Sequence, residues 1–251
     1  MGDLAKQLGS LSVVIPAFNA AHQIVGTLDA IQAFLNRDGI AHEIIVVDDG
    51  SRDETVETVT RRNGGVRVLV NERNRGKGYS VRRGMLEARC DWVLFTDVDH
   101  ATPIEHVTGF ALHAADNDIL IGSRRLTESA IVRRQPRVRQ MMGRLFPYLV
   151  RALVLPQFAD TQCGFKMFRR GVAHDLFGRA QVDRFCFDVE ILAMAVAAGY
   201  RIAELPVNWR NPEGGSTLRI VQDTQRMLAD LWRIRGRIKR GFKLNGQPGG
   251  S

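Results

Sequence analysis

Short, continuous apolar runs alternate with amphipathic stretches through the first half of the chain. The runs that we predict to be strands are Leu11–Pro16, Glu43–Val47, Val66–Val70, Trp92–Thr96 and Asp118–Gly122. The stretches with helical spacing between them are Ile24–Leu35, Glu54–Arg62, Gly78–Ala88 and Ile104–Ala115. Because the runs are apolar throughout instead of alternating with polar residues, both faces of each strand must be covered. The pattern therefore predicts an α/β fold in which helices flank a mostly parallel sheet.

The pattern changes after Ser123. Arg124–Arg151 is a basic segment whose second half has the spacing of an amphipathic helix. The elements predicted beyond it are a strand at Phe165–Phe168, a helix at Phe187–Ala198, a strand at Ile202–Trp209 and a basic amphipathic helix from Thr217 to Arg240. We accordingly expect a main domain over residues 11–217, which divides into 11–123 and 124–217. The parts outside it are an N-terminal extension (1–10), the basic amphipathic helix (218–244) and a disordered tail rich in Gly and Pro (245–251).

The composition suits a globular domain with a sizeable core, since the 251 residues are 45% hydrophobic and 25% charged. The net charge of +8 is unevenly distributed along the chain. Residues 1–123 contain 12 Lys and Arg against 17 Asp and Glu, whereas residues 124–251 contain 23 against 10. A nucleic-acid binder would more often concentrate its basic residues in one motif. We therefore expect two halves with different partners, and no nucleic acid among them.

The cysteines and the apolar stretches bear on the cellular location. Cys90, Cys163 and Cys186 have neither the spacing of a disulfide framework nor that of a zinc site. No apolar stretch approaches the roughly 18 residues of a membrane span, and residues 1–10 lack the apolar core of a signal peptide. These observations predict a cytoplasmic protein.

Polar residues follow three of the predicted strands at the point where each strand ends. They are Pro16–Asn19, Asp48–Ser51 and Asp97–Asp99. Ligands of parallel α/β sheets bind outside the carboxyl ends of the strands, so these residues predict a binding site. Asp97 and Asp99 both leave the strand toward it, and Mg²⁺ or Mn²⁺ prefers a few carboxylates together with phosphate oxygens. We therefore predict a divalent metal at these two carboxylates.

Two further motifs have both a structural and a functional interpretation. In Asp48–Ser51 the polar residues suit a tight turn and the cap of the next helix, through Ser51 or Asp53. This explanation leaves a spare carboxylate for a nucleobase or a ribose. Arg73–Gly78 resembles a phosphate-binding loop, because its glycines let backbone N–H groups approach an anion. It lacks Walker A spacing, and no Gly-x-Gly-x-x-Gly follows the first strand.

Taken together, the motifs resemble those of a known family. Val13–Asn19, Ile45–Ser51, Asn74–Gly78 and Asp97–Asp99 are similar to the nucleotide-sugar motifs of family 2 glycosyltransferases with the GT-A fold. A second set resembles the branch that glucosylates or mannosylates dolichyl or other polyprenyl phosphates: Gly122–Arg124, Asp160–Lys166 and Phe187–Glu190. The resemblance extends from Ser12 to Leu218. It implies an inverting, metal-dependent transfer of a hexose from UDP-glucose or GDP-mannose to a polyprenyl phosphate.

The resemblance also implies which residues bind the donor. Those expected to bind the nucleotide sugar are Pro16, Ala17, Phe18, Asn19, Val47, Asp49, Lys77, Asp97, Val98 and Asp99. Asp97 and Asp99 would also hold Mg²⁺ or Mn²⁺. The chain departs from the family pattern at Ala20–Ala21, where an acidic residue is usual, and at Gly214–Thr217, where the usual lysine is missing. Arg210 or Arg219 would replace that lysine, and the identity of the nucleotide stays open.

The acceptor decides which further residues the chemistry needs. A polyprenyl phosphate is already ionised and needs cations, for which the candidates are Arg124, Arg125, Arg133, Arg134 and Arg210. A soluble hydroxyl acceptor would instead need a general base, for which Asp188 and Asp160 are the candidates. Each of these also has a structural explanation, as a helix N-cap for Asp188 and as a turn residue for Asp160. A third alternative is a basic lipid- or nucleic-acid-binding module without enzymatic activity.

The basic amphipathic helices suggest a membrane surface. Arginines on one side of such a helix and Leu, Met or Trp on the other allow it to lie in the headgroup layer. We therefore expect a protein that is peripheral on the cytosolic membrane face. The alternative interpretations of the same helices are a solvated surface and the interface of a homodimer.

Overall fold

The structure is a computed structural model that describes residues 3–62, 64–126, 129, 146–210 and 220–240. Its centre is a 7-stranded sheet with the order β3-β2-β1-β4-β6-β5-β7. The strands are β1 (Ser10–Ala17), β2 (Ala41–Asp48), β3 (Val66–Val70), β4 (Trp92–Thr96), β5 (Ile119–Ser123), β6 (Phe165–Arg169) and β7 (Ile202–Pro206). All neighbouring strands are parallel except β6, which is antiparallel to β4 and to β5. The predicted α/β fold with a mostly parallel sheet is confirmed.

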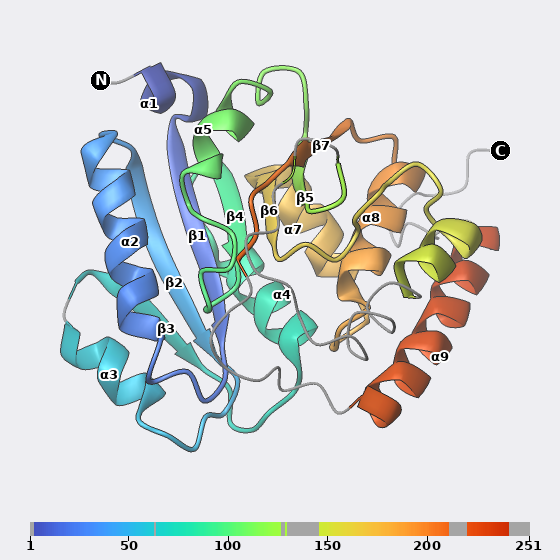
Figure 1. The fold of residues 1–251 in the computed structure, drawn as a ribbon, viewed down its shortest axis with the longest axis horizontal. Coiled ribbons are helices and arrows are strands. Elements are labelled where there is room, and N and C mark those ends of the chain that lie inside the picture. The colour runs from blue at the N-terminus through green and yellow to red at the C-terminus, as the bar shows by residue number, and fades with distance from the viewer. Residues whose placement is uncertain (1–2, 63, 127–128, 130–145, 211–219, 241–251) are drawn as a thin grey trace, which may run out of the picture.

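Helices cover both faces of this sheet (Figure 1). One face carries α1 (Asp3–Leu8), α2 (Ile24–Arg37), α3 (Thr55–Arg62) and α5 (His106–Ala111), which share an apolar core with the strands. The other face carries α4 (Lys77–Glu87), α7 (Arg170–Arg179), α8 (Phe187–Ala197), α9 (Ile220–Lys239) and a helical stretch at residues 146–153. Every residue of β4 and β5 is buried, which explains why these strands have no polar alternation.

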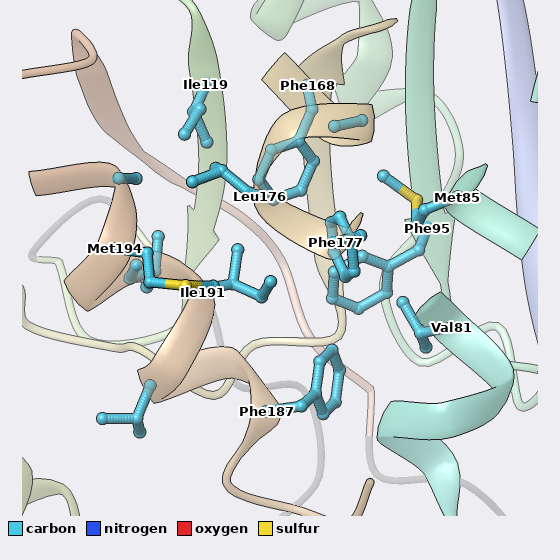
Figure 2. Packing of buried hydrophobic residues seen from close by; sticks show 14 of the residues in the cluster. Val81, Met85, Phe95, Ile119, Phe168, Leu176, Phe177, Phe187, Ile191 and Met194 are labelled. Carbon is cyan, nitrogen blue, oxygen red and sulfur yellow. The ribbon is translucent and has the colours of Figure 1, made fainter. Parts of the chain in front are cut away.

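Aromatic side chains join α7 and α8 to the sheet in the apolar core on this second face (Figure 2). The rings of Phe95 in β4 and Phe187 in α8 lie 5.6 Å apart between centroids. Phe168 in β6 and Phe177 in α7 form an edge-on pair at 5.5 Å. Rings at these distances attract each other beyond the area that they bury. The first turn of α8 is therefore held against β4, close to the strand end where the predicted metal site begins.

The structure corrects several predicted elements. The helix predicted over Ile104–Ala115 is helical only at His106–Ala111, and turns flank it. The last strand ends at Pro206 instead of Trp209. Two helices were not predicted at all, namely α1 and α7. α7 has only four buried residues, Val172, Ala173, Leu176 and Phe177, among polar and glycine positions, so its apolar pattern was too weak to recognise.

The basic helices are described in part. Residues 146–153 and α9 are helical within the two regions predicted to be amphipathic. Residues 141–145 of the first helix and the tail 245–251 lie outside the described residues. None of the helices that the structure describes is both long and apolar enough to span a bilayer.

Candidate functional site

The predicted site residues meet at one edge of the sheet because of the strand directions. β1, β2 and β4 are parallel, so the residues that follow Ala17, Asp48 and Thr96 emerge on the same side. β6 runs the opposite way, and its first residue, Phe165, pairs with Thr96, the last residue of β4. The turn at residues 160–164, which precedes β6, therefore lies beside the end of β4. The motifs that are expected to bind the donor and the acceptor come together at this point.

Asp97 forms an ion pair with a lysine of the predicted phosphate-binding loop. The Nζ atom of Lys77 lies 2.6 Å from Asp97 Oδ1. Lys77 is the first residue of α4 and lies between Gly76 and Gly78, the glycines that were predicted to approach an anion. Burial lowers the pKa of Lys77, but the charges of Asp97, Asp188 and Asp99 outweigh burial and leave that pKa raised. Lys77 is therefore a permanent cation at the end of β4.

Asp99 lies in the turn after Asp97 and has an environment suited to a cation. Its Oδ1 accepts a hydrogen bond of 3.0 Å from the backbone N–H of Ala101, and the carbonyl of Val98 accepts one of 2.6 Å from Thr27. Burial, and then the charge of Asp97, raise the pKa of Asp99. A divalent cation would relieve this repulsion. Two carboxylates suffice for Mg²⁺ or Mn²⁺ when phosphate oxygens supply further ligands, so the residues present fit the predicted metal.

The protein alone does not build a complete metal cage here. In the part of the chain that the structure describes, no cluster of three or more His, Cys, Asp or Glu is arranged to hold a metal ion.

Asp49 organises the loop that precedes Lys77. Its carboxylate accepts hydrogen bonds from Asn71 Nδ2 at 2.9 Å, from the Arg75 N–H at 2.9 Å and from the Gly76 N–H at 2.8 Å. Sequence analysis assigned Asp49 to binding of the nucleotide sugar and did not predict its role in the loop. Its neighbour Asp48 has the spare oxygen: Oδ2 accepts from the Ser51 N–H at 2.9 Å, whereas Oδ1 is buried and has no hydrogen-bond partner among the described residues.

The segment after β1 is tied to the turn after β2. Asn19 adopts a positive φ of 50°, which asparagine tolerates better than most residues. Its Oδ1 accepts a 2.9 Å hydrogen bond from the Arg52 N–H, and its own N–H donates to Ser51 Oγ at 2.9 Å. The predicted helix cap is confirmed at Asp53, which accepts from the Thr55 N–H at the start of α3. These hydrogen bonds fix the segment Pro16–Asn19 against Asp48–Ser51, and the two segments together form one edge of the candidate site.

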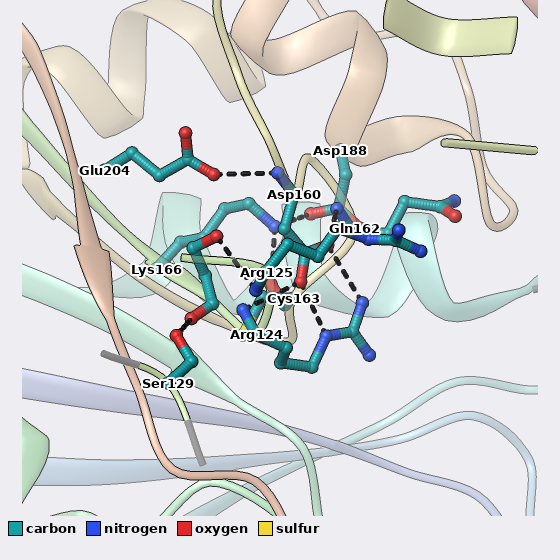
Figure 3. Close-up of polar contacts among 10 residues, drawn as sticks. Arg124, Arg125, Ser129, Asp160, Gln162, Cys163, Lys166, Asp188 and Glu204 are labelled. Atoms are coloured by element: carbon teal, nitrogen blue, oxygen red, sulfur yellow. Dashed lines mark hydrogen bonds and ion pairs between the residues drawn. The ribbon is translucent and has the colours of Figure 1, made fainter. Parts of the chain in front are cut away.

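Arg124, whose side chain is 28% exposed, forms a bidentate ion pair with the fully buried Asp160 (Figure 3). Arg124 Nε lies 2.6 Å from Asp160 Oδ2, and Nη2 lies 2.9 Å from Oδ1. The backbone N–H of Arg124 donates to Oδ2 as well, at 3.1 Å. Burial raises the pKa of Asp160, but Arg124 outweighs burial and holds that pKa at about 2. Asp160 therefore stays ionised and orients the guanidinium of Arg124.

Asp188 pairs with Lys166, which sequence analysis missed. Lys166 Nζ donates to Asp188 Oδ1 and to the carbonyl of Cys163, each at 2.6 Å (Figure 3). The side chains are only 1% and 5% exposed. Burial raises the pKa of Asp188, and the charges of Lys166 and Lys77 offset this only in part. The N-cap explanation of Asp188 is wrong, because α8 begins at Phe187, its N-cap is Cys186 and no side chain caps it. The sequence offered one indication of this pair, because a lysine inside an apolar strand needs a partner for its charge.

Gly164 joins the turn before β6 to the predicted metal site. A Cβ atom at this position would lie 2.1 Å from Asp97 Oδ2, and the Gly164 carbonyl accepts a 3.2 Å hydrogen bond from the Asp97 N–H. Only glycine allows so close an approach. Asp97 is thus held between Lys77 and this turn, and the turn also contains Asp160.

The structure gives fewer contacts for the other arginines that were predicted to bind phosphate. The N–H of Arg210 donates to the Ala101 carbonyl at 2.8 Å, which brings residue 210 next to the turn that holds Asp99. The N–H of Arg125 donates to Ser123 Oγ at 3.4 Å. Arg133, Arg134 and Arg219 lie outside the described residues. The described network thus links Lys77, Asp97, Asp160, Asp188 and Arg124 in one place.

Comparison with known proteins identifies the kind of protein. The profile of glycosyl transferase family 2 matches residues 12–177. The chain is 36% identical over 248 residues to a dolichyl-phosphate beta-glucosyltransferase of Dictyostelium discoideum, covering 92% of this chain and 76% of that protein. It is 34% identical over 223 residues to the human protein of the same name, covering 81% of this chain and 68% of that protein.

Solved structures show the same fold. Glucosyl-3-phosphoglycerate synthase from Mycobacterium tuberculosis, in complex with Mn²⁺, uridine diphosphate and phosphoglyceric acid, matches with a TM-score of 0.70 at 20% identity, covering 94% of this chain and 84% of that chain. Mannosyl-3-phosphoglycerate synthase from Rubrobacter xylanophilus matches with a TM-score of 0.68 at 20% identity, covering 100% of this chain and 82% of that chain. The predicted GT-A fold is confirmed, and the alternative of a non-enzymatic binding module is set aside. The chain belongs to glycosyl transferase family 2 and is a glycosyltransferase.

Proposed function

We propose that this glycosyltransferase transfers a hexose from a nucleotide sugar to the phosphate of a dolichyl or other polyprenyl phosphate. The similarity to dolichyl-phosphate beta-glucosyltransferases supports this acceptor, and it favours UDP-glucose over GDP-mannose as the donor. One observation carries the proposal: at the described site the cations Lys77 and Arg124 are held in place, while Asp160 and Asp188 are already engaged by cations. Such a site suits two anionic substrates.

On the donor side, the leaving diphosphate must be neutralised. Lys77 keeps its charge because three carboxylates raise its pKa, and it lies at the end of β4, where the diphosphate is expected. Asp97 and Asp99 would hold Mg²⁺ or Mn²⁺, which supplies further positive charge to the departing diphosphate. Pro16, Ala17, Phe18, Asn19, Val47, Asp49 and Val98 are the proposed contacts to the nucleoside. The buried Oδ1 of Asp48, which has no hydrogen-bond partner among the described residues, is a further candidate acceptor beside Asp49.

On the acceptor side, the phosphate needs orientation and no base. A phosphate monoester is ionised at neutral pH, so its oxygen can attack the anomeric carbon directly. Arg124 suits a phosphate because its guanidinium is planar and its orientation is fixed by Asp160. Arg125, Arg133, Arg134 and Arg210 are the proposed additional phosphate contacts. Attack from the face opposite the diphosphate inverts the anomeric centre, in keeping with the β product in the relatives' names.

A hydroxyl acceptor is the second candidate, and the site supports it less well. It would require a carboxylate to take the proton of the hydroxyl. Asp160 is a poor base because its pKa is about 2 and both of its oxygens are bonded to Arg124. Asp188 has a raised pKa but is almost fully buried and is paired with Lys166. The state of these two groups therefore favours a phosphate acceptor.

We also propose that the protein binds peripherally to the cytosolic face of a membrane, where a polyprenyl phosphate presents its headgroup. Trp232 in α9 is 62% exposed, and the guanidinium of Arg235 lies 5.6 Å from the centroid of its ring. An exposed tryptophan beside arginines suits the boundary between headgroups and acyl chains. A homodimer remains an alternative use of the same helix face.

The decisive experiment combines the substrates with one variant. The protein is incubated with UDP-glucose or GDP-mannose, Mn²⁺ or Mg²⁺ and a polyprenyl phosphate, and the glycolipid is measured by mass spectrometry. Asp99→Ala should lower kcat about 100-fold or more, because metal-assisted charge stabilisation contributes several kcal/mol. Asp116→Ala, at an exposed turn position, is the control and should leave kcat unchanged. Undiminished transfer by Asp99→Ala would refute the metal-dependent mechanism.

A further inference from the structure

Glu190 is a fully buried carboxylate that the proposed chemistry does not use. It lies in the first turn of α8, and its exposed fraction is 0%. Its Oε2 accepts hydrogen bonds from the Gln181 N–H at 2.9 Å and from the Val182 N–H at 2.8 Å. Its Oε1 is paired with Arg237 of α9. Glu190 therefore connects the C-terminal helix to the backbone at residues 181–182.

The segment at residues 180–184 in turn supports residues 73–79, which lead into the start of α4 and are called the Lys77 loop below. The carbonyl of Asp183 accepts a 2.9 Å hydrogen bond from the Tyr79 N–H. A Cβ at Gly76 would lie 2.6 Å from that same carbonyl oxygen, and a Cβ at Gly78 would lie 2.7 Å from the Val182 carbonyl oxygen. The backbone on both sides of Lys77 is therefore in direct contact with this segment. Any shift of residues 181–183 would move the loop.

A second set of contacts joins residues 180–184 to α4. Arg82 in α4 pairs with Asp183 at 2.8 Å and donates to the Ala180 carbonyl at 2.9 Å. Both ends of the segment are thus attached to α4, and its middle is attached to Glu190. The segment has no regular secondary structure of its own, so these contacts determine its position.

α9 is anchored firmly enough to act as the outer support. Leu231 and Ile234 are each 1% exposed and belong to the same core cluster as Val182 and Phe187. α9 lies beside α8, at the far side of the molecule from α2 and α3 (Figure 1). Arg237 is located one turn beyond this apolar contact and supplies the charge that compensates Glu190.

We propose that Glu190 and Arg237 are positioning residues through which α9 holds the Lys77 loop in its donor-binding conformation. A carboxylate buried without a partner is costly, so the loss of Arg237 would turn Glu190 toward water and free the N–H groups of residues 181–182. Binding of the donor would then have to order the loop, and this ordering reduces affinity. The inference rests on the proposed function, since it assumes a nucleoside diphosphate at Lys77.

The test compares two single variants with the wild-type protein. Binding of UDP and of GDP in the presence of Mn²⁺ is measured by calorimetry, and KM for the donor and kcat are measured at saturating acceptor. In Arg237→Ala, Kd and the donor KM should rise about tenfold, which is about 1.4 kcal/mol of binding free energy, while kcat at saturating donor stays near the wild-type value. Arg237→Lys, which keeps the charge, should recover part of the affinity.

The control is Arg233→Ala on the same helix, because Arg233 is 67% exposed and its ion pair is with Asp230 of α9 itself. It should leave Kd unchanged. Wild-type affinity in a folded Arg237→Ala, or a lowered Tm without a change in Kd, would overturn the inference. If Arg237→Ala does not fold, Arg237→Gln, which removes the charge but keeps more of the side chain, takes its place. A wild-type Kd with a lowered Tm in that variant would again assign the pair a purely structural role. Failure of the wild-type protein to bind either nucleotide would instead refute the proposed function, and this inference with it.

Discussion

Asp160 and Asp188 are both buried, yet their surroundings shift their pKa values in opposite directions. Asp160 accepts three hydrogen bonds from Arg124, and these outweigh burial and hold its pKa at about 2. Asp188 accepts from Lys166 at 2.6 Å, which does not outweigh burial, so its pKa is raised. The number and geometry of the donors decide which effect is larger.

Asp160 should therefore contribute to stability in a pH-dependent way. Its pKa falls from 3.8 to about 2 on folding, which is worth about 2 kcal/mol. Because the folded-state pKa is the lower one, this stabilisation is complete above about pH 4 and is lost as the pH falls toward 2. Asp160→Asn should lower the free energy of unfolding at pH 7 by at least about 2 kcal/mol, since it also leaves Arg124 without its partner charge. Urea unfolding at several pH values measures this.

The pH series is also the check on this assignment. The difference between wild type and Asp160→Asn should shrink as the pH falls from 4 to 3, whereas Asp116→Asn, at an exposed position, should differ little from wild type throughout. If the difference is constant with pH, pairing with Arg124 does not lower the pKa of Asp160.

The position of α4 depends on a close approach to the sheet. A Cβ at Gly84 would lie 2.3 Å from Val14 Cγ1 of β1 and 3.0 Å from Val47 Cγ2 of β2. Gly84→Ala should therefore destabilise the protein by about 1–3 kcal/mol through overpacking. It should also lower transfer activity, because α4 begins with Lys77. Chemical unfolding and the glycolipid assay measure the two effects.

A glycine in another helix provides the matched control for α4. Gly26 lies in α2, and a Cβ there would meet nothing within 4 Å. Gly26→Ala should leave activity unchanged and stabilise the fold by up to about 1 kcal/mol, because alanine favours a helix more than glycine does. Equal effects of the two substitutions would contradict the close packing of α4.

The helices and strands differ in how far the sequence predicts them. Val66–Val70 and Trp92–Thr96 are strands with the predicted bounds. Trp92–Thr96 is buried throughout, as expected of a continuous apolar run. Val66–Val70, in contrast, is the edge strand β3 and is only partly buried, so the expectation that both of its faces are covered is wrong. The direction of β6 and its place between β4 and β5 could not be predicted, since strand pairing depends on contacts between distant segments. Helix α7 was missed because its buried stripe is narrow.

The site residues also differ in how far the sequence predicts them. Asp97 and Asp99 were recognisable because strand ends of a parallel sheet meet at one edge. Lys166 and Glu190 were not, because their partners are distant in the sequence: Lys166 pairs with Asp188 and Glu190 pairs with Arg237. The predicted metal ligands Asp97 and Asp99 can be inferred from one strand end, whereas the ion pairs of Lys166 and Glu190 are defined only by tertiary contacts.

The two halves of the whole molecule carry opposite charge, and the structure gives this asymmetry a spatial meaning. Residues 1–123, with 17 acidic against 12 basic residues, build the part with β1 to β5, whereas 23 of the basic residues follow. α9 and residues 146–153 belong to the basic half and lie together on one side of the sheet. An anionic membrane surface would attract the basic half of the chain.

A membrane-facing α9 predicts how Trp232 contributes to lipid binding. Trp232→Ser should weaken partitioning to vesicles that contain phosphatidylserine about tenfold, because burial of a large apolar side chain contributes about 1.5–3 kcal/mol. Binding of the wild-type protein should weaken with added salt, since each basic residue near the surface contributes about 1 kcal/mol that salt screens. Co-sedimentation measures both effects. The control is Leu112→Ser in the acidic half, where Leu112 is 67% exposed. If it reduces binding as much as Trp232→Ser, or if neutral vesicles bind the protein equally well, α9 is not the membrane-facing element.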